Sequence, residues 1–136
     1  MRVLVTGSRK FKDIVRVFEA LDDLHRGPRG PITCIIHGGA KGADALGKEW
    51  AIEHNVKQRP FLAKWNDLWV PGAVIKHNLA TGKRYNVLAG FWRNQAMVDE
   101  GKPDVCVYFK LEGVKNAGTQ DMIDRCEKAG IERIEG

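Results

Sequence analysis

Long apolar runs are missing from this chain of 136 residues. Its longest stretches without a charged residue, such as 30–40, hold about ten residues, whereas a membrane-spanning helix needs roughly 20. The N-terminus has an apolar run of only three residues before Thr6, too short for the ~7–15 apolar residues of a secretory signal. We therefore expect a cytoplasmic protein that does not bind membranes.

Cysteine is also scarce. Cys34, Cys106 and Cys126 form an odd set without a C-x-x-C pair, and the four histidines do not cluster. This pattern predicts neither a disulfide framework nor a zinc site. We expect the cysteines to be small buried hydrophobic residues of a reducing compartment, and we expect no metal and no other cofactor.

The common nucleotide-binding fingerprints are absent as well. Residues 38–44 are rich in glycine but lack the G-K-[ST] ending of a Walker A loop, and no G-x-G-x-x-G follows the first apolar run. The sequence therefore indicates neither a P-loop ATPase nor an ordinary NAD-dependent dehydrogenase.

What the chain does contain is an alternation of apolar runs with helical patterns. The runs 2–6, 32–36, 56–61, 105–109 and 131–134 predict short strands, and the segments 11–25, 43–51, 90–100 and 119–129 have the spacing of helices. Such strands need crossover connections and become buried on both faces. We predict one α/β domain over 1–136, Rossmann-like, with a mostly parallel sheet and helices on both faces.

Three polar turns rich in glycine follow predicted strands. In open α/β sheets ligands bind beyond the carboxyl ends of the strands, where helix N-termini favour anions. Each turn alone could be a tight connection, and Asp44 could equally cap a helix or contact a sugar hydroxyl. The ligand-binding candidates in these turns are Gly7, Ser8, Arg9, Gly38, Gly39, Lys41, Gly42, Asp44, Gly118 and Thr119.

Basic and aromatic residues gather in the segment 62–93. It holds five basic residues against one acidic residue, and three of the four tryptophans. Its stretch 62–90 is longer than the ~12–15 residues at which structureless loops become uncommon. It could be a surface excursion, a lid that brings Arg93 with Lys83 or Arg84 to a phosphate, or a stacking platform for single-stranded nucleic acid. We favour the lid.

The order of these residues resembles a known superfamily. The chain is similar to the small, single-domain, YspA-like branch of the SLOG superfamily, which includes the DNA-processing DprA/SMF proteins and the LOG-type phosphoribohydrolases. The resemblance implies a Rossmann-like fold that binds nucleotides or nucleotide-derived signals, with Arg93 and Asn94 added to the site. The matching pieces are Gly7-Ser8-Arg9, residues 38–44, Trp50-Ala51, Trp65, Ala89-Gly90-x-x-Arg93-Asn94-x-x-Met97 and residues 118–123.

The LOG catalytic pattern is only partly present. LOG proteins carry R-K-x-x-M and G-G-x-G-T-x-x-E, and here Arg93, Met97, Gly118 and Thr119 match while Met122 stands at the glutamate position. Cleavage of an N-glycosidic bond needs a carboxylate, which methionine cannot supply. The candidates for catalysis are then Arg93 with Asp44 or Asp121.

We thus expect a protein that binds or senses a nucleotide-like small molecule. The alternatives are an N-glycosidase of the LOG type and a nucleic-acid accessory protein of the DprA type, with nucleic acid the less favoured partner. LOG-type relatives form dimers, so the resemblance implies at least a homodimer. The apolar residues Phe91, Trp92, Ala96, Met97 and Val98, more than one helix face needs against a small sheet, support this expectation.

Overall fold

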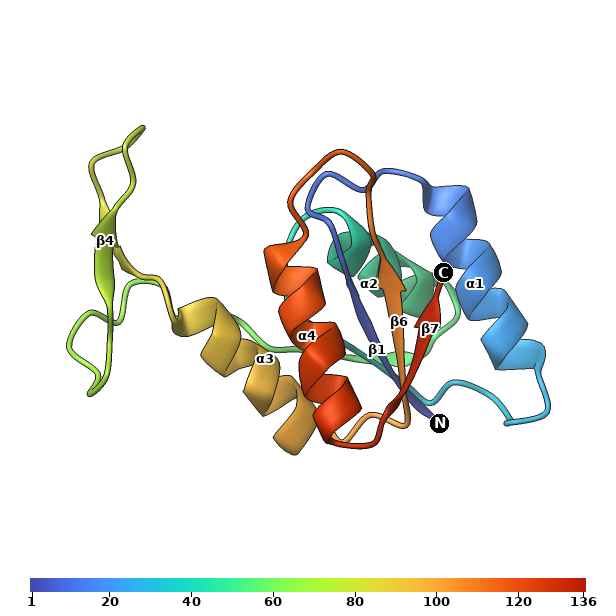
Figure 1. Cartoon of the computed structure of the whole chain (residues 1–136). Coiled ribbons are helices and arrows are strands. Elements are labelled where there is room, and N and C mark those ends of the chain that lie inside the picture. Colours follow the sequence, from blue (N-terminus) through green and yellow to red (C-terminus); the bar gives the residue numbers. More distant parts are fainter.

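The computed structural model describes all residues from Met1 to Gly136 and contains two sheets. The main sheet has five strands in the order β3-β2-β1-β6-β7, all parallel (Figure 1). Its elements are β1 (Arg2–Gly7), α1 (Ile14–Arg26), β2 (Cys34–His37), α2 (Ala43–Glu53), β3 (Lys57–Pro60), α3 (Ala89–Asp99), β6 (Val105–Phe109), α4 (Ala117–Lys128) and β7 (Glu132–Glu135). This arrangement confirms the predicted Rossmann-like α/β fold.

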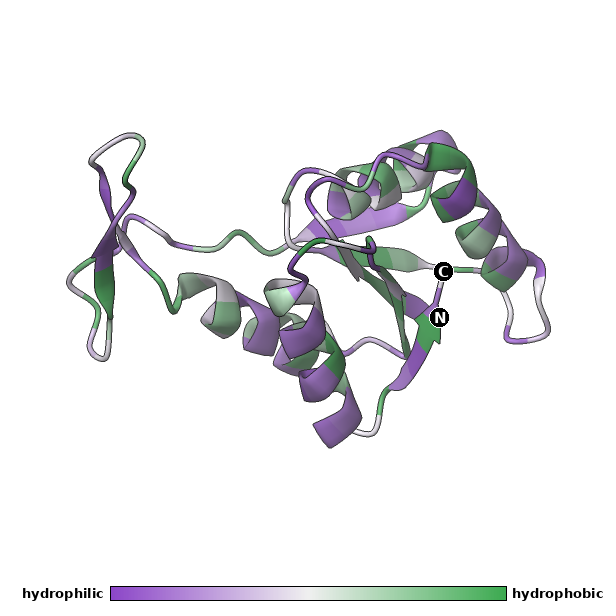
Figure 2. Cartoon of the chain, turned by 45° about the horizontal axis from the view of Figure 1, so that its top comes forward, coloured by the Kyte–Doolittle hydropathy of each residue, from purple (hydrophilic) through white to green (hydrophobic).

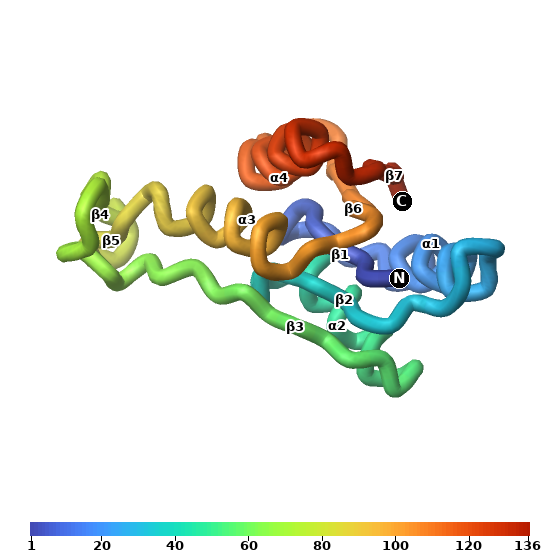
Figure 3. The backbone as a smooth tube through the Cα atoms, turned by 90° about the horizontal axis from the view of Figure 1, so that it is seen from below, coloured from blue at the N-terminus to red at the C-terminus, as the bar shows by residue number.

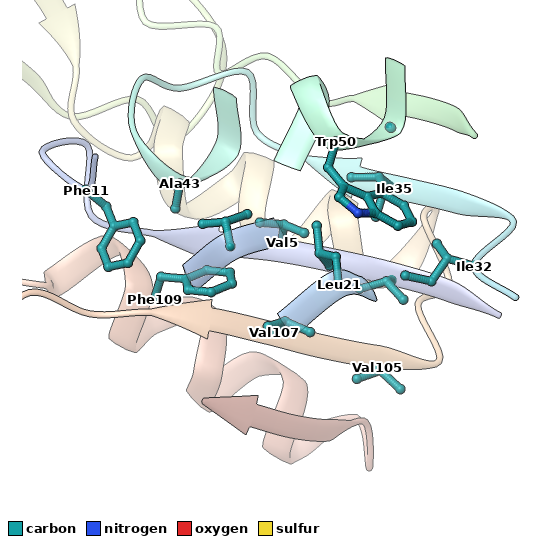
Figure 4. Close-up of a cluster of buried hydrophobic side chains, with 13 residues drawn as sticks. Val5, Phe11, Leu21, Ile32, Ile35, Ala43, Trp50, Val105, Val107 and Phe109 are labelled. Atoms are coloured by element: carbon teal, nitrogen blue, oxygen red, sulfur yellow. The ribbon is translucent and has the colours of Figure 1, made fainter. Parts of the chain in front are cut away.

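Helices cover both faces of the sheet, which explains why the central strands are continuously apolar. Successive side chains of a strand point to opposite faces. Val3 and Val5 of β1 therefore pack with α1 and α2 in one buried cluster, which also contains Trp50 (Figure 4), whereas Leu4 packs with α3 and α4 in the other. Figure 3 shows the helices distributed about the strands.

The helix and strand bounds differ from the expected ones by a few residues. The clearest case is α1, which begins at Ile14 rather than near Phe11 because the Asp13 side chain accepts a hydrogen bond from Arg16 N at 3.1 Å and caps the helix. Phe11 still packs in the core ahead of the helix and is 2% exposed. All three cysteines are free and buried, as the sequence predicted.

The basic segment forms an arm rather than a simple loop. After an extended stretch from Phe61, β4 (Ile75–His77) and β5 (Arg84–Asn86) pair as an antiparallel hairpin. The hairpin projects away from the body of the domain (Figures 1 and 2). No helix of the chain is both long and apolar enough to cross a membrane.

The lid interpretation was therefore wrong for part of this segment. Lys83 and Arg84 are exposed on the hairpin and do not line the cavity at the strand ends. Trp65, at the base of the arm, does line this cavity, and so does Arg93 in α3. A two-stranded hairpin that neither a third strand nor a helix covers has no apolar face with which to pack against the body of the domain.

Candidate functional site at the strand ends

A cavity of about 520 Å³ opens at the carboxyl ends of β1 and β6. The chain winds from β1 to β2 and β3 on one side, then returns to β6 and β7 on the other side of β1. The crevice between β1 and β6 is therefore the topological switch point, where ligands bind in open α/β sheets. The cavity's lining is made of the end of β1, the turns that follow β1, β2 and β6, parts of α2, α3 and α4, and Trp65 with Val87 from the arm.

The turn after β1 has a fixed backbone. Ser8 N donates to Phe109 O at 3.0 Å, and Ser8 O accepts from Ala43 N at 3.2 Å, so this turn is tied to both β6 and α2. Gly7 is required there because a β-carbon would lie 2.5 Å from Phe109 O and 2.6 Å from the β-carbon of Ala43. Arg9 extends from the turn with its guanidinium 5.9 Å from the centre of the Trp65 ring.

The turn after β2 is fixed by hydrogen bonds of the buried His37 side chain. His37 is 2% exposed, and its Nδ1 accepts from Gly39 N at 3.0 Å while its Nε2 lies 2.6 Å from Gln58 Oε1. Nε2 must then carry the hydrogen and donate to the glutamine. Gly42 has φ +77°, and a β-carbon there would collide with Ser8 O. His37 and Gly42 thus shape the turn, and neither lines the cavity.

Asp44 and Arg93 meet at Gly38. Arg93 Nη1 donates to Gly38 O at 2.6 Å, and Gly38 N donates to Asp44 Oδ2 at 2.9 Å. Burial raises the pKa of Asp44, opposed by the hydrogen bonds from Ala40 N and Gly38 N and by the nearby guanidinium; burial also lowers the pKa of Arg93. A β-carbon on Gly38 would collide with Arg93 Nη1, so only glycine leaves room for this arrangement.

The third turn ends at the N-terminus of α4. Its N-cap residue, Asn116, makes no side-chain hydrogen bond to the helix, and the first turn of α4 contains no acidic residue. The unpaired N–H groups of this turn therefore carry an uncompensated partial positive charge. Ala117, Gly118 and Thr119 line the cavity at this point.

Positive charge dominates the cavity. Arg9, Lys10, Arg93 and Lys115 line it, and Asp44 is its one acidic residue. Burial, which raises the pKa of Asp44, disfavours the charged form of this carboxyl. The cavity is suited to an anion, held by cations and by helix N–H groups.

Asp121 lies outside this arrangement. Its Oδ2 accepts from Arg125 Nε at 2.7 Å and from Asn94 Nδ2 at 3.0 Å, and it does not line the cavity. Asn94 also donates to Gly118 O at 3.2 Å, so it links α3 to the start of α4. Asp121 thus contributes to the packing of these two helices.

Nine of the twelve ligand-binding candidates line the cavity, and three do not. Lys41 is exposed, Gly39 sits beneath Leu62, and Gly42 packs against the turn after β1. The lining residues are Gly7, Ser8, Arg9, Gly38, Asp44, Arg93, Asn94, Gly118 and Thr119.

Several lining residues were not among the candidates. Lys10 directly follows the first candidate turn, Lys115 directly precedes the third, and Asn116 is the first residue of the third, so their proximity to strand ends was a usable signal. Phe91 had no such signal, and the only signal for Trp65 was its place in the family resemblance. Trp65 packs over α3 where a β-carbon on Gly90 would lie 2.9 Å from its ring, a contact that only the tertiary structure creates.

Comparisons with known proteins identify the family of this chain. A family model described as "YspA, cpYpsA-related SLOG family" matches residues 1–67. The Gene 61 protein of Mycobacterium phage D29 is 37% identical over 131 residues, which are 96% of this chain and 91% of that protein. The chain belongs to the SLOG superfamily.

A solved structure supports the same fold for this SLOG protein. DNA processing protein A (DprA) from Streptococcus pneumoniae aligns with a TM-score of 0.51 and 16% identity, over 98% of this chain. The present chain spans only 58% of that DprA chain. At this identity the likeness concerns the fold alone.

Proposed function

We propose that this SLOG protein binds a nucleotide or nucleotide-derived small molecule at the strand ends and acts as a sensor or binding protein. The observation that carries the proposal is the uncapped N-terminus of α4 facing a cavity with four cations. A phosphate group is the biological anion that best matches backbone N–H groups combined with Lys and Arg.

The remaining walls suit the other parts of a nucleotide. Trp65 and Phe91 offer aromatic surface on which a base can stack. Asp44 uses Oδ2 for both of its backbone hydrogen bonds, so Oδ1 has no partner in the protein and is free to contact a sugar hydroxyl. Phosphate, base and sugar would then each meet a chemically matched wall of one cavity.

Binding without hydrolysis is favoured by the environment of Met122. This residue, at the glutamate position of the LOG pattern, is fully buried among Leu4, Met97 and Cys126. A carboxylate at that position would face hydrocarbon rather than the ligand. Asp121, the neighbouring acid, is occupied by Arg125 and Asn94.

The proposal is tested by native mass spectrometry of the purified protein against a set of nucleoside mono-, di- and triphosphates. We expect at least one adduct that survives gentle activation, and chromatography of the same mixtures should detect no free base after hours. Absence of any nucleotide adduct at micromolar protein would refute binding, and steady release of base would refute a purely binding role.

A second candidate function, N-glycosidic hydrolysis, rests on the raised pKa of Asp44. A carboxyl whose pKa is raised by burial is better suited to hold and deliver a proton, so beside a nucleotide cavity it could protonate a departing base, with Arg93 against the phosphate or sugar. If base release is observed, Asp44→Asn should abolish it while Asp121→Asn should retain it. The reverse result would exclude Asp44 as the acid.

Nucleic-acid binding is the third candidate, and the hairpin arm favours it. From Leu68 to Leu88 the chain has three basic residues, Lys76, Lys83 and Arg84, and no acidic residue. Trp69, near the base of the arm, is 90% exposed. Exposed aromatic rings between cations are the elements of single-strand binding surfaces. Titration of single-stranded DNA at two salt concentrations tests this role, because phosphate-driven binding must weaken as salt rises.

We also propose that the protein forms a homodimer. The helix α3 leaves Phe91 37% and Trp92 40% exposed, next to the projecting arm. Large exposed apolar side chains grouped on one element are typical of interfaces. Met97 and Val98, in contrast, are buried in the core of the monomer and do not contribute to such a surface.

A further inference from the structure

Two hydroxyl groups in the inner part of the strand-end cavity have no partner in the chain. They belong to Thr6, near the end of β1, and Thr119, in the first turn of α4, which are only 9% and 5% exposed and both line the cavity. The side-chain polar atoms that are both inaccessible and unpaired are Asn86 Nδ2 and Asn116 Oδ1. The two threonine hydroxyls are not among them, so they keep accessible surface that a ligand can reach.

The direction of both threonine side chains follows from the pattern of β1 and α4. Thr6 comes two residues after Leu4, so it points to the face of the sheet that α3 and α4 cover. Thr119 comes three residues before Met122, which packs in one cluster with Leu4, so it lies on the helix face turned toward the sheet. Both hydroxyls therefore face the space between β1 and the start of α4, beside the unpaired N–H groups of that helix. A phosphate group in this space would accept hydrogen bonds from all of these donors.

The cations of the cavity differ in what they already bind. Arg93 is partly buried and donates to two oxygens of the chain, at 2.6 Å and 3.0 Å. Arg9, Lys10 and Lys115 are exposed, and their side chains make no ion pair or hydrogen bond within the chain. These three cations, together with the N-terminus of α4, exceed the charge of one phosphate monoester, which is about −1.5 to −2 at pH 7.

Lys10 and Lys115 stand on neighbouring turns at the rim of the cavity. The strands β1 and β6 pair as far as Gly7 and Phe109, so the turns that follow them lie beside each other at one end of the sheet (Figure 1). Lys115 occupies the position of the first glycine in the G-G-x-G-T-x-x-E pattern of LOG proteins. This pair of rim charges is therefore a feature of the present chain rather than of that pattern.

We propose that the ligand carries a chain of at least two phosphates and belongs to the nucleoside diphosphate class. The inner phosphate lies against Thr6, Thr119 and the start of α4, and the outer phosphate lies between Lys10 and Lys115. Hydroxyl and N–H groups fixed on the fold hold the inner phosphate in one place, while the flexible lysines act as point charges on the outer one. The proposal rests on nucleotide binding at the strand ends and adds the class of the ligand.

Paired mono- and diphosphates of adenosine, guanosine, cytidine and uridine test the second phosphate. Calorimetry is done in a metal-free buffer, so that no Mg²⁺ neutralises the phosphates. For the base that binds most tightly, we expect at least tenfold stronger binding of the diphosphate. Equal affinities of the two would overturn the outer phosphate position and leave nucleotide binding intact. No measurable binding of any of these nucleotides would refute nucleotide binding itself and this proposal with it.

Variants separate the outer phosphate position from the inner one. Lys10→Gln and Lys115→Gln should each weaken diphosphate binding at least fivefold and change monophosphate binding less than twofold. Thr119→Val removes a hydroxyl at nearly constant shape and should weaken both ligands by a similar factor, at least threefold. Lys12→Gln is the matched control, because Lys12 is exposed and does not line the cavity. Lysine variants that weaken both ligands equally, or neither, would overturn the proposal.

Discussion

At the scale of single residues, the site depends on positions where a side chain is absent. Gly38 lets Arg93 approach the turn after β2, and Gly90 lets Trp65 lie over α3. Gly118 differs from both, because a β-carbon there would meet no atom within 4 Å. The space beside Gly118 is therefore not used in the packing of the protein and is open to the proposed ligand.

We predict that Gly118→Leu blocks ligand binding without unfolding the protein. The new side chain lies at the start of α4, beside the N–H groups proposed to hold phosphate, and replacing glycine in a helix stabilises it by roughly 0.5–1 kcal/mol. Calorimetry with the nucleotide found by mass spectrometry should show at least tenfold weaker binding, with no fall in Tm. Gly113→Leu would be a poor control, because the φ of Gly113 is +74° and a leucine there would strain the backbone. Gln120→Leu, in the same helix as Gly118, is the control instead. Unchanged affinity of Gly118→Leu would remove this end of α4 from the site.

A second residue-scale prediction concerns Asp44 and pH. Because its pKa is raised in the folded protein by burial, the native state binds more protons than the unfolded state at pH values above the ordinary pKa of 3.8. Stability of the wild type therefore falls as pH rises from this value toward the raised pKa, and the loss persists at higher pH. Asp44→Asn lacks this titration but keeps an oxygen for Gly38 N.

The measurement is urea unfolding of both proteins at pH 4 and pH 7. The free energy of unfolding of Asp44→Asn minus that of the wild type should be larger at pH 7 than at pH 4. A constant difference would show that Asp44 has the same pKa in both states. Asp121→Asn is the matched control, because it makes the same chemical change at a position outside the cavity, where the carboxylate pairs with Arg125.

At the scale of elements, the arm and the domain body are separable. The hairpin is closed by its own hydrogen bonds, such as Asn78 N to Lys83 O at 2.8 Å, and Leu79 at its tip is fully exposed. Bonds to the rest of the chain occur at its base, where Asn86 N donates to Trp65 O at 2.8 Å. The tip therefore contributes little to the stability of the fold.

We predict that the tip can be removed without loss of the fold. Replacing residues 77–84 by Asn-Gly joins Lys76 to Tyr85, which are paired across the hairpin, through a two-residue turn. Circular dichroism should show a Tm within a few degrees of the wild type. If the arm binds single-stranded DNA, the loss of Lys83 and Arg84 should also reduce the salt dependence of binding. A large drop in Tm would mean that the tip packs on something, such as a second subunit.

At the scale of the whole molecule, the exposed apolar surface of α3 predicts an oligomer. A two-fold interface uses the same patch on both subunits, so one charge introduced into it is repeated and acts twice. We expect Trp92→Glu to dissociate the dimer while each subunit stays folded, since Trp92 is 40% exposed in the monomer. Light scattering at micromolar concentration checks this, with Leu79→Glu at the arm's tip as the control. A wild-type mass of 15.2 kDa would contradict the homodimer.

The sequence by itself determined the strands of the main sheet, the helices and the edge of the sheet where the candidate site lies, but not the hairpin of β4 and β5. Runs such as 105–109 are apolar throughout because both faces of the strand are covered, and this pattern is local and readable. The turns after such strands must lie at one edge of a parallel sheet. The candidates Ser8, Asp44 and Thr119 could thus be chosen without a structure.

Only the tertiary structure decided which residues of those turns face the cavity. Arg93 reaches Gly38 across 55 positions of sequence, and this contact depends on how α3 packs against the sheet. Lys41 points outward because the backbone of its turn is set by the fit of Gly42 against Ser8. The direction of the arm is also set by the tertiary structure. Its composition predicts a binding partner, but the arm has no core contacts, so its direction follows from the geometry of the two elements that it joins.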